Sequence, residues 1–364
     1  MARSPPAADD PLHPRDGVAG SSVEDVRYEK KDGVARITID RPAALNAYTT
    51  ATLAHLKERF RDAALDDSVG VVVLTGSGSR AFCTGGDVKE YAERFVRRPR
   101  DYWKYMQLFR EVVESILRVG KPTIARVNGM AIGGGNELHL ACDLSVAAEH
   151  AVIGQVGVGV GSVAAGGATQ WLPLTVGDRR ARRMLFLNER VGAAEALDWG
   201  LVSEVAPSVR HDGTWLSAPS AEAIRWAQKE ERNHRVDLSE LDTAVDRLSG
   251  RLLEMFPECL RYTKAQANFW KELAWNQTVG HAQEWLTLHF ATAEPYEGMH
   301  SFVDKRPPRI SEMRRRLADG QEVGFLHGAP VRSCPSCGQD GLPEAFRYCG
   351  RCGELLTTPS PPGA

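Results

Sequence analysis

The chain has 364 residues, of which 43% are hydrophobic and 25% are charged, as in an ordinary globular protein with room for one large domain and additions. A formal net charge of −2 argues against nucleic acid or an acidic membrane surface as the main partner. No apolar run approaches the roughly 20 residues that cross a bilayer, and the first residues show neither a signal-peptide nor a transit-peptide pattern. We therefore expect a cytoplasmic protein without a nucleic-acid or membrane partner.

The predicted elements begin after a disordered tail, which the Pro/Ala/Asp-rich composition indicates for residues 1–23. Two short strands around a Lys-Asp-Gly turn are predicted for 24–40, and a helix for 50–67. This alternation predicts an α/β core over 24–210 with mostly parallel strands. Further strand and helix patterns cover 69–78, 101–120, 121–133, 135–155, 178–188 and 191–207.

The sequence pattern changes near residue 211. Helical periodicity with aromatic anchors predicts a largely helical C-terminal region over 211–330, packed on the core or on a neighbouring subunit. A small cysteine-rich unit is expected over 331–355, followed by a second disordered tail over 356–364.

Four of the seven cysteines form two Cys-x2-Cys pairs separated by eleven residues. Each pair suits a turn that directs two thiolates at one metal, which predicts a structural zinc ribbon without an open coordination position. Two disulfides are the alternative. The ribbon would either hold the C-terminus or dock a protein partner. The expected ligands are Cys334, Cys337, Cys349 and Cys352, whereas we expect plain buried thiols at Cys83, Cys142 and Cys259.

Two glycine-rich turns each lead from a strand into a helix. The segment GMAIGGGNELHLACD places three glycines before Glu137, and RAFCTGGDVKEY places two glycines before Asp87, a plausible N-cap. Backbone N–H groups exposed at such turns stabilise an anion, and glycines allow a ligand to approach closely. Two donors from two loops would make an oxyanion hole, although each turn alone is equally explained by packing.

Segments of the chain resemble the crotonase (enoyl-CoA hydratase/isomerase) superfamily in order and spacing over about 27–207. They are ITIDRPAALNAYT, AFCTGGDVKEY, NGMAIGGGNELHLACDLSVAAEHAVIGQ and GGATQWLPLTVGDRRARRMLFLNERVGAAEALDWGLVSEVAP. The resemblance implies a ClpP-like spiral of ββα units, assembled as a homotrimer or homohexamer, that binds acyl-CoA thioesters. It assigns the thioester oxyanion to the N–H groups of Gly86 and Gly134.

The same resemblance places coenzyme A, as part of the substrate, near Arg41, Ala44 and Lys89. Solvation at the surface is an equal explanation for the two basic residues.

Glu137 matches the first of the two catalytic glutamates that activate water in hydratases of this family. Its apolar neighbours predict a raised pKa; the alternative is a buried structural glutamate satisfied by backbone donors. The second glutamate is replaced by Gly157 in the segment IGQVG, so hydration by two glutamates is not expected. The polar residues that would hold water in its place, although each is also an ordinary loop residue, are Gln155, Ser162 and Thr169.

Three other residues near these motifs have less specific expectations. His139, two positions after Glu137, points away from it on a helix and is expected to be packed or solvated. Tyr91 and Trp103 either line the acyl pocket or pack in the core.

Several segments narrow the resemblance to 6-oxocyclohex-1-ene-1-carbonyl-CoA hydrolases of aromatic-compound breakdown, above all VDLSELDTAVDRLSGRLLEMFPECL beyond the common core. This implies addition of water to a cyclic conjugated oxo-acyl-CoA, followed by attack of water on the ring ketone and ring opening. The loop IGQVGVGVGS has Val-Gly-Val where that branch tends to have Pro-Lys-His, which leaves the acyl group open. The alternatives are an enoyl-CoA hydratase or isomerase with a single glutamate, and a catalytically weak binding or assembly module.

Overall fold

The computed structural model describes residues 25–356 except 322, 326 and 329. The tails expected over 1–23 and 356–364 lie outside the described residues, apart from Leu356. No helix in the described part of the chain is both long and apolar enough to cross a membrane.

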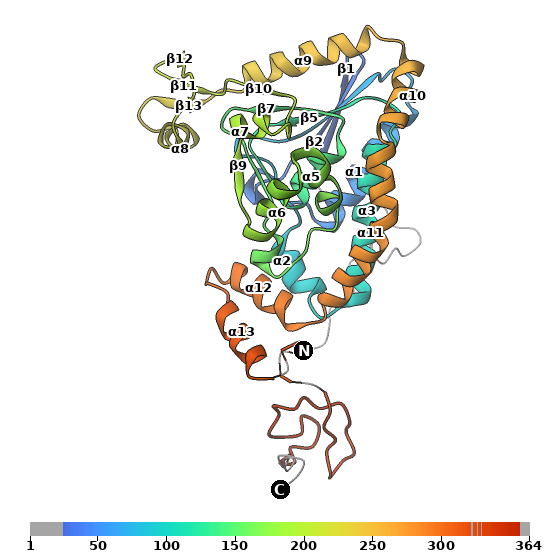
Figure 1. Ribbon diagram of the computed structural model, residues 1–364, viewed down its shortest axis with the longest axis vertical. Helices are drawn as coiled ribbons and strands as arrows, with labels where there is room; N and C mark the ends of the chain where they lie inside the picture. Colours follow the sequence, from blue (N-terminus) through green and yellow to red (C-terminus); the bar gives the residue numbers. More distant parts are fainter. Residues whose placement is uncertain (1–24, 322, 326, 329, 357–364) are drawn as a thin grey trace.

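The core is built around a six-stranded sheet in the order β1-β2-β3-β5-β7-β10 (Figure 1). Its first two strands form an antiparallel hairpin, and every later neighbour pairs in parallel, as predicted. The strands are β1 (Val26–Lys31), β2 (Val34–Ile39), β3 (Val71–Gly76), β5 (Thr123–Val127), β7 (Leu144–Ala148) and β10 (Glu204–Ala206).

The alternation of side chains along β3 shows how the sheet is covered on both faces. Val72 and Leu74 join the large core under α1 (Thr50–Leu65) and α3 (Pro99–Leu117). Val71 and Val73 face the opposite way, toward α9 (Ser239–Leu253). Because both faces of a parallel sheet are buried, the strand reads as a continuous apolar run.

A second sheet of four strands, in the order β4-β6-β8-β9, lies beside the first. Successive units place one strand in the large sheet and the next in the small sheet, and then a helix: β3–β4, β5–β6–α4 and β7–β8–α5. The α/β spiral of ββα units predicted from the sequence is thereby confirmed. The bounds are β4 (Ala81–Cys83), β6 (Met130–Ile132), β8 (Val152–Gly154), β9 (Arg190–Gly192), α4 (Gly134–Ala141), α5 (Ala168–Val176), α6 (Asp178–Leu187) and α7 (Ala193–Asp198).

The region expected to be largely helical opens with a small sheet instead. Strands β11 (Val209–His211), β12 (Thr214–Trp215) and β13 (His234–Val236) pair around α8 (Ala221–Lys229). An Asp-Gly turn with positive φ at both residues, 48° and 78°, joins β11 to β12. This is the pattern that favours a tight hairpin, so the signal was present in the sequence.

The remaining chain is helical, as predicted, and wraps back onto the core (Figure 1). The long helix α11 packs on α3 and α5. Helix α12 contacts the helical turns over residues 88–95, after the glycines of RAFCTGGDVKEY, and the 3-10 turn Gly157–Val160 after β8. The cysteine-rich unit follows at the far end of the molecule. The helices are α10 (Pro257–Ala267), α11 (Phe269–His289), α12 (Ala293–Val303) and α13 (Ile310–Ala318). Cys259 is exposed on α10, so the expectation of a buried thiol was wrong there; most of that helix faces solvent.

Candidate active site

A cavity opens where the two glycine turns, the loop after β8 and the C-terminal helices meet. About 620 Å³ of space lies between its walls, part of it open to solvent. Its lining is mainly apolar and aromatic with a few polar groups, which is the usual character of a small-molecule site. Both Gly86 and Gly134 line it, together with Glu137. The residues that sequence analysis grouped by motif therefore converge in space.

The N–H groups of Gly86 and Gly134 have no hydrogen-bond acceptor among the described residues. Gly86 forms a parallel bridge with Tyr48 just before α2 (Val88–Glu90). Gly134 is the first residue of α4, where helical N–H groups lack partners. The two turns are close: a Cβ on Gly85 would lie 3.0 Å from the nitrogen of Gly134. Two free donors at one place meet the requirement for an oxyanion hole.

Each glycine before Glu137 has its own physical reason. Gly133 adopts φ 58° at the start of α4, a conformation that favours glycine. A Cβ on Gly134 would lie 1.8 Å from the hydroxyl of Tyr48, and one on Gly135 would lie 1.9 Å from the carbonyl oxygen of Cys83. The run therefore sets the turn, exposes a donor and lets α4 pack against β4.

Glu137 is 4% exposed and lies one turn into α4. Its Oε1 accepts hydrogen bonds from the N–H groups of Gly166 at 2.7 Å and Ala168 at 3.1 Å. Oε2 has no partner in the part of the chain that the structure describes. Burial raises the pKa of Glu137 to about 7, and the two backbone donors oppose that rise. The carboxyl thus has the raised pKa of one sequence interpretation and the backbone donors of the other, and its catalytic role stays a prediction.

The place of the second glutamate is taken by Gly157, which also lines the cavity. Among the residues expected to hold water, Gln155 and Ser162 line it as well. Nε2 of Gln155 donates to the carbonyl oxygen of Gly133 at 3.3 Å. Thr169 is exposed and is not brought to the cavity. Its hydroxyl donates to Gln170 because its place in the first turn of α5 directs it outward.

Of the residues with less specific expectations, Tyr91 lines the cavity and Trp103 does not. Trp103 is 46% exposed, whereas the preceding residue, Tyr102, faces the cavity; one step along a helix turns a side chain by about 100°. His139 is buried against Asn136, and burial lowers its pKa to about 4.

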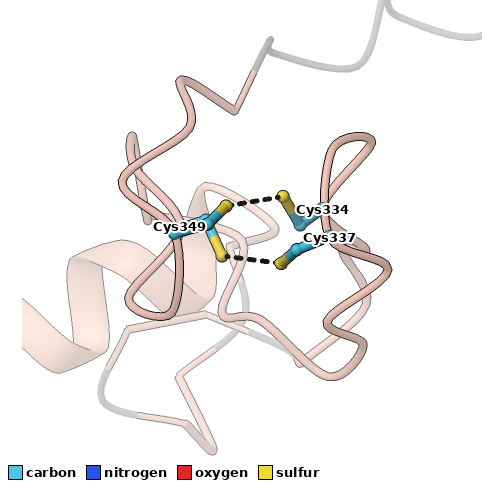
Figure 2. Close-up of side chains that lie close together, drawn as sticks. Cys334, Cys337 and Cys349 are labelled. Carbon is cyan, nitrogen blue, oxygen red and sulfur yellow. Dashed lines mark hydrogen bonds between the residues drawn. The ribbon is translucent and has the colours of Figure 1, made fainter.

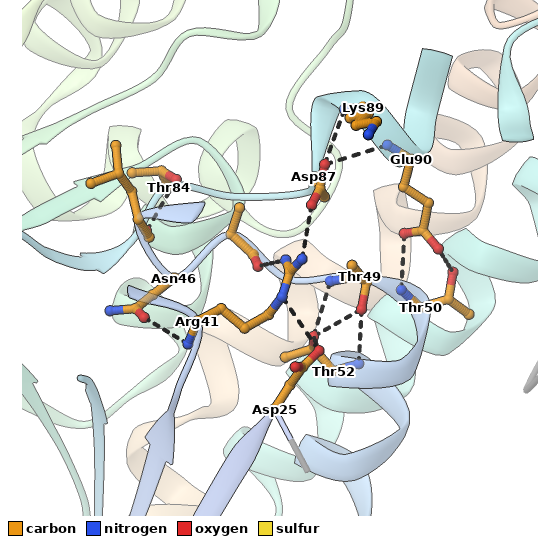
Figure 3. A network of polar contacts seen from close by, with 12 residues as sticks. Asp25, Arg41, Asn46, Thr49, Thr50, Thr52, Thr84, Asp87, Lys89 and Glu90 are labelled. Atoms are coloured by element: carbon orange, nitrogen blue, oxygen red, sulfur yellow. Dashed lines mark hydrogen bonds and ion pairs between the residues drawn. The ribbon is translucent and has the colours of Figure 1, made fainter. Parts of the chain in front are cut away.

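Arg41, which the resemblance assigns to coenzyme A, is engaged within the protein (Figure 3). Its guanidinium contacts Asp87 at 3.1 Å, Asp25 at 3.4 Å and the carbonyl oxygen of Ala47. Asp87 in turn accepts from the N–H groups of Lys89 and Glu90 and caps α2, as predicted. Arg41 therefore braces the turn that carries Gly86.

The other two residues assigned to coenzyme A are at least partly exposed. The Lys89 side chain is 74% exposed at the start of α2, and Ala44 is partly buried in a short 3-10 turn. A contact of these three residues with coenzyme A stays a prediction.

The four paired cysteines come together near the C-terminus (Figure 2). Their Sγ atoms all lie within 4.8 Å of one another, with 3.6 Å between Cys334 and Cys352 and 3.7 Å between Cys337 and Cys349. A zinc ion at 2.3 Å from four sulfurs requires edges of about 3.8 Å. The donor set and its spacing therefore fit a tetrahedral metal ion.

Several cavity residues were not assigned to it by the sequence. Tyr48 and Phe109 stack with ring centroids 5.1 Å apart, and Leu286 and Met299 close the cavity from α11 and α12. The helical period of α3 marks a buried stripe but does not tell a core residue from a cavity residue. No local signal distinguishes the two C-terminal side chains from others in their helices.

Comparison with known proteins agrees with this architecture. The chain belongs to the enoyl-CoA hydratase/isomerase family, whose pattern it matches over residues 29–313, and it is thus an enzyme of the acyl-CoA hydrolase or hydratase type. A crystal structure of an enoyl-CoA hydratase from Mycobacterium avium subsp. paratuberculosis is 26% identical, with a TM-score of 0.64 over 79% of this chain and 99% of that one. Another, from Bacillus anthracis, has 26% identity, a TM-score of 0.56 and coverage of 78% and 98%.

The names of the curated relatives are more specific than the family description. A 6-oxocyclohex-1-ene-1-carbonyl-CoA hydrolase from Geobacter metallireducens is 37% identical over 81% of this chain and 87% of that protein. Proteins of the same name from Thauera aromatica and Syntrophus aciditrophicus are 36% and 31% identical, over 78% and 75% of this chain and 82% and 77% of theirs.

Proposed function

We propose that this protein adds water to a cyclic, conjugated oxo-acyl-CoA and then hydrolyses a carbon–carbon bond to open the ring. The observation that carries the proposal is Glu137, buried, with a pKa of about 7 and one oxygen free in a cavity beside two unpaired N–H groups. The name shared by the curated relatives supports the substrate class.

In the first stage the thioester oxygen would accept from the N–H groups of Gly86 and Gly134. These donors stabilise the enolate that forms when water adds to the conjugated double bond, an effect worth ~2.7–4 kcal/mol per donor. The Oε2 atom of ionised Glu137 would remove the proton from that water, and the acid so formed would protonate the carbon next to the thioester. A carboxyl group that titrates near pH 7 serves in both directions.

In the second stage a further water would attack the ring ketone. Glu137 again takes a proton from the water, and the bond between the ketone carbon and the carbon next to the thioester breaks. The electron pair passes to the thioester enolate in the same oxyanion hole, and protonation of that carbon completes the step. The ketone carbon becomes a carboxylate, and its proton is lost to solvent. One glutamate suffices because the two stages use it in turn, which suits the glycine at position 157.

We also propose that the four cysteines bind a structural zinc ion, which would hold the two Cys-x2-Cys turns together, and that the protein assembles as a homotrimer or homohexamer. Exposed large apolar side chains on α6 and α11 support an assembly. They are Phe186, Leu187, Trp270 and Trp285.

The proposed activity is tested by mass spectrometry of products formed in heavy-oxygen water. The substrates are crotonyl-CoA, cyclohex-1-ene-1-carbonyl-CoA and 6-oxocyclohex-1-ene-1-carbonyl-CoA. Gain of two labelled oxygens with ring opening, for the last substrate alone, is the expected result. Gain of a single water on all three would identify a hydratase, and no product from any would favour the binding-module alternative.

Glu137→Gln tests the site itself. We expect turnover to fall by about 10²–10⁴-fold while affinity for a coenzyme A thioester is kept. Glu149→Gln is the matched control, because Glu149 is a carboxyl with a raised pKa that likewise accepts a backbone N–H, from Ala218, but is only partly buried and does not line the cavity. Unchanged turnover in Glu137→Gln would refute the assignment.

A further inference from the structure

The Tyr48 hydroxyl is a polar group of the cavity that lies close to Gly134. Three tyrosines line this space. The hydroxyl of Tyr91 bonds to that of Tyr105 at 2.8 Å. Tyr48 is 2% exposed, yet its hydroxyl has no hydrogen-bond partner within the described ranges. Because Tyr48 lines the cavity, its hydroxyl is free to donate a hydrogen bond to a polar group of a bound ligand.

Its backbone and its side chain connect the two halves of the oxyanion hole. The Tyr48 N–H donates to the carbonyl oxygen of Gly85 at 2.9 Å, and its carbonyl oxygen accepts from Asp87 at 2.9 Å. These bonds hold the turn that carries Gly86. The hydroxyl reaches the other turn, where a Cβ on Gly134 would lie 1.8 Å from it. Stacking on Phe109 fixes the ring.

We propose that the Tyr48 hydroxyl donates a hydrogen bond to the ring ketone oxygen of the substrate and stabilises the alkoxide formed when water attacks that ketone. This inference rests on the proposed ring-opening function and extends it. In such a substrate the ketone and the thioester carbonyl are attached to the same carbon, so their oxygens lie side by side when both face the same way. A donor for the ketone must then lie next to the donors for the thioester, as Tyr48 lies next to Gly134.

The chemistry of the hydroxyl suits this role. Burial raises the pKa of Tyr48 well above its ordinary value, so the group stays protonated at neutral pH and can donate. The water's oxygen forms a bond with the ketone carbon, Glu137 takes its proton, and the ketone oxygen carries the negative charge against Tyr48. Collapse of that adduct breaks the ring bond and returns the electron pair to the thioester enolate. Tyr48 keeps its own proton throughout.

The test compares Tyr48→Phe with wild type on 6-oxocyclohex-1-ene-1-carbonyl-CoA and on the ketone-free cyclohex-1-ene-1-carbonyl-CoA in heavy-oxygen water. Ring opening should fall by about 10²–10³-fold, the usual loss for one oxyanion donor, and the singly hydrated cyclic hydroxyketone should accumulate. Hydration of the ketone-free substrate should fall much less, so that the ratio of the two rates changes at least tenfold. Tyr28→Phe is the control, since its hydroxyl is also without a partner in the described chain but belongs to β1.

The outcomes separate the two proposals. Ring opening by wild type with an unchanged ratio in Tyr48→Phe, or an equal fall on both substrates, would overturn the role of Tyr48 and leave the proposed function standing. Absence of ring opening by wild type would overturn both. Thermal unfolding checks that the variant is folded. Because Tyr48→Phe breaks no hydrogen bond among the described residues, its melting temperature should equal or exceed that of wild type.

Discussion

At the scale of single residues, Glu137 shows how a fold sets the proton affinity of one carboxyl group. Burial disfavours the charged form, and the N–H groups of Gly166 and Ala168 favour it; burial has the larger effect, so the pKa rises to about 7. Gly166 also leaves room for the carboxyl, because a Cβ there would lie 2.7 Å from Oε2 and 2.2 Å from Phe109.

The pH dependence of catalysis follows from that pKa. A general base acts in its ionised form, so kcat/KM for the hydration step should rise with pH, pass half of its maximum near pH 7 and level off above it. The measurement is a pH–rate profile between pH 5 and 9 with a ketone-free enoyl-CoA. A profile that is flat from pH 5 to 9 would show that Glu137 is not the base.

The same group links stability to pH. Its folded pKa lies above the unfolded value near 4.5, so its favourable contribution is complete below about pH 4.5 and is lost as pH rises through 7. Wild type should therefore lose stability relative to Glu137→Gln between pH 5 and 8. Urea unfolding of both proteins across that range checks the sign, and parallel curves would contradict it.

At the scale of elements, α4 depends on close contact with β4. A Cβ on Gly135 would lie 1.9 Å from the carbonyl oxygen of Cys83, a backbone atom that cannot move alone. The helix would have to shift, and the N–H of Gly134 and the carboxyl of Glu137, the proposed donor and base, would shift with it.

We therefore expect Gly135→Ala to lower both the melting temperature and turnover. The matched control is Gly250→Ala in α9, where nothing lies within 4 Å of the added methyl group. Replacing a glycine inside a helix by alanine at such an open site stabilises by about 0.5–1 kcal/mol, so the control should melt slightly higher. Thermal unfolding and steady-state rates of the two variants test this expectation. Equal melting temperatures and equal turnover in the two variants would refute the packing argument.

At the scale of the whole molecule, the cysteine-rich unit is separate from the cavity. No lining residue of the cavity lies beyond Met299, and the unit has its own small core, in which Leu342 and Leu356 pack with Cys334 and Cys349. Leu356 belongs to that core, although a tail was expected to begin there.

Metal content tests the unit directly. Elemental analysis of purified protein should find a zinc ion for each chain, and Cys349→Ser should lose it. Cys259→Ser, which changes an exposed cysteine on α10, should retain it. We expect the Cys349→Ser variant to keep acyl-CoA turnover because the cavity is remote from the ligands. Disulfides in place of zinc would appear as a lower intact mass without metal.

The sequence by itself determined the α/β class, the alternating units and the Cys-x2-Cys pairs, because these depend on local periodicity and short spacings. It also located the glycine turns and Glu137, because each motif is contiguous. The tertiary structure alone decided that Thr169 faces outward, that Tyr102 rather than Trp103 enters the cavity, and that Arg41 is held by Asp25 and Asp87. It also brought Tyr48 and Met299, 251 positions apart in the numbering, into one wall. Such placements depend on how distant elements pack together, and no short stretch of sequence records that packing.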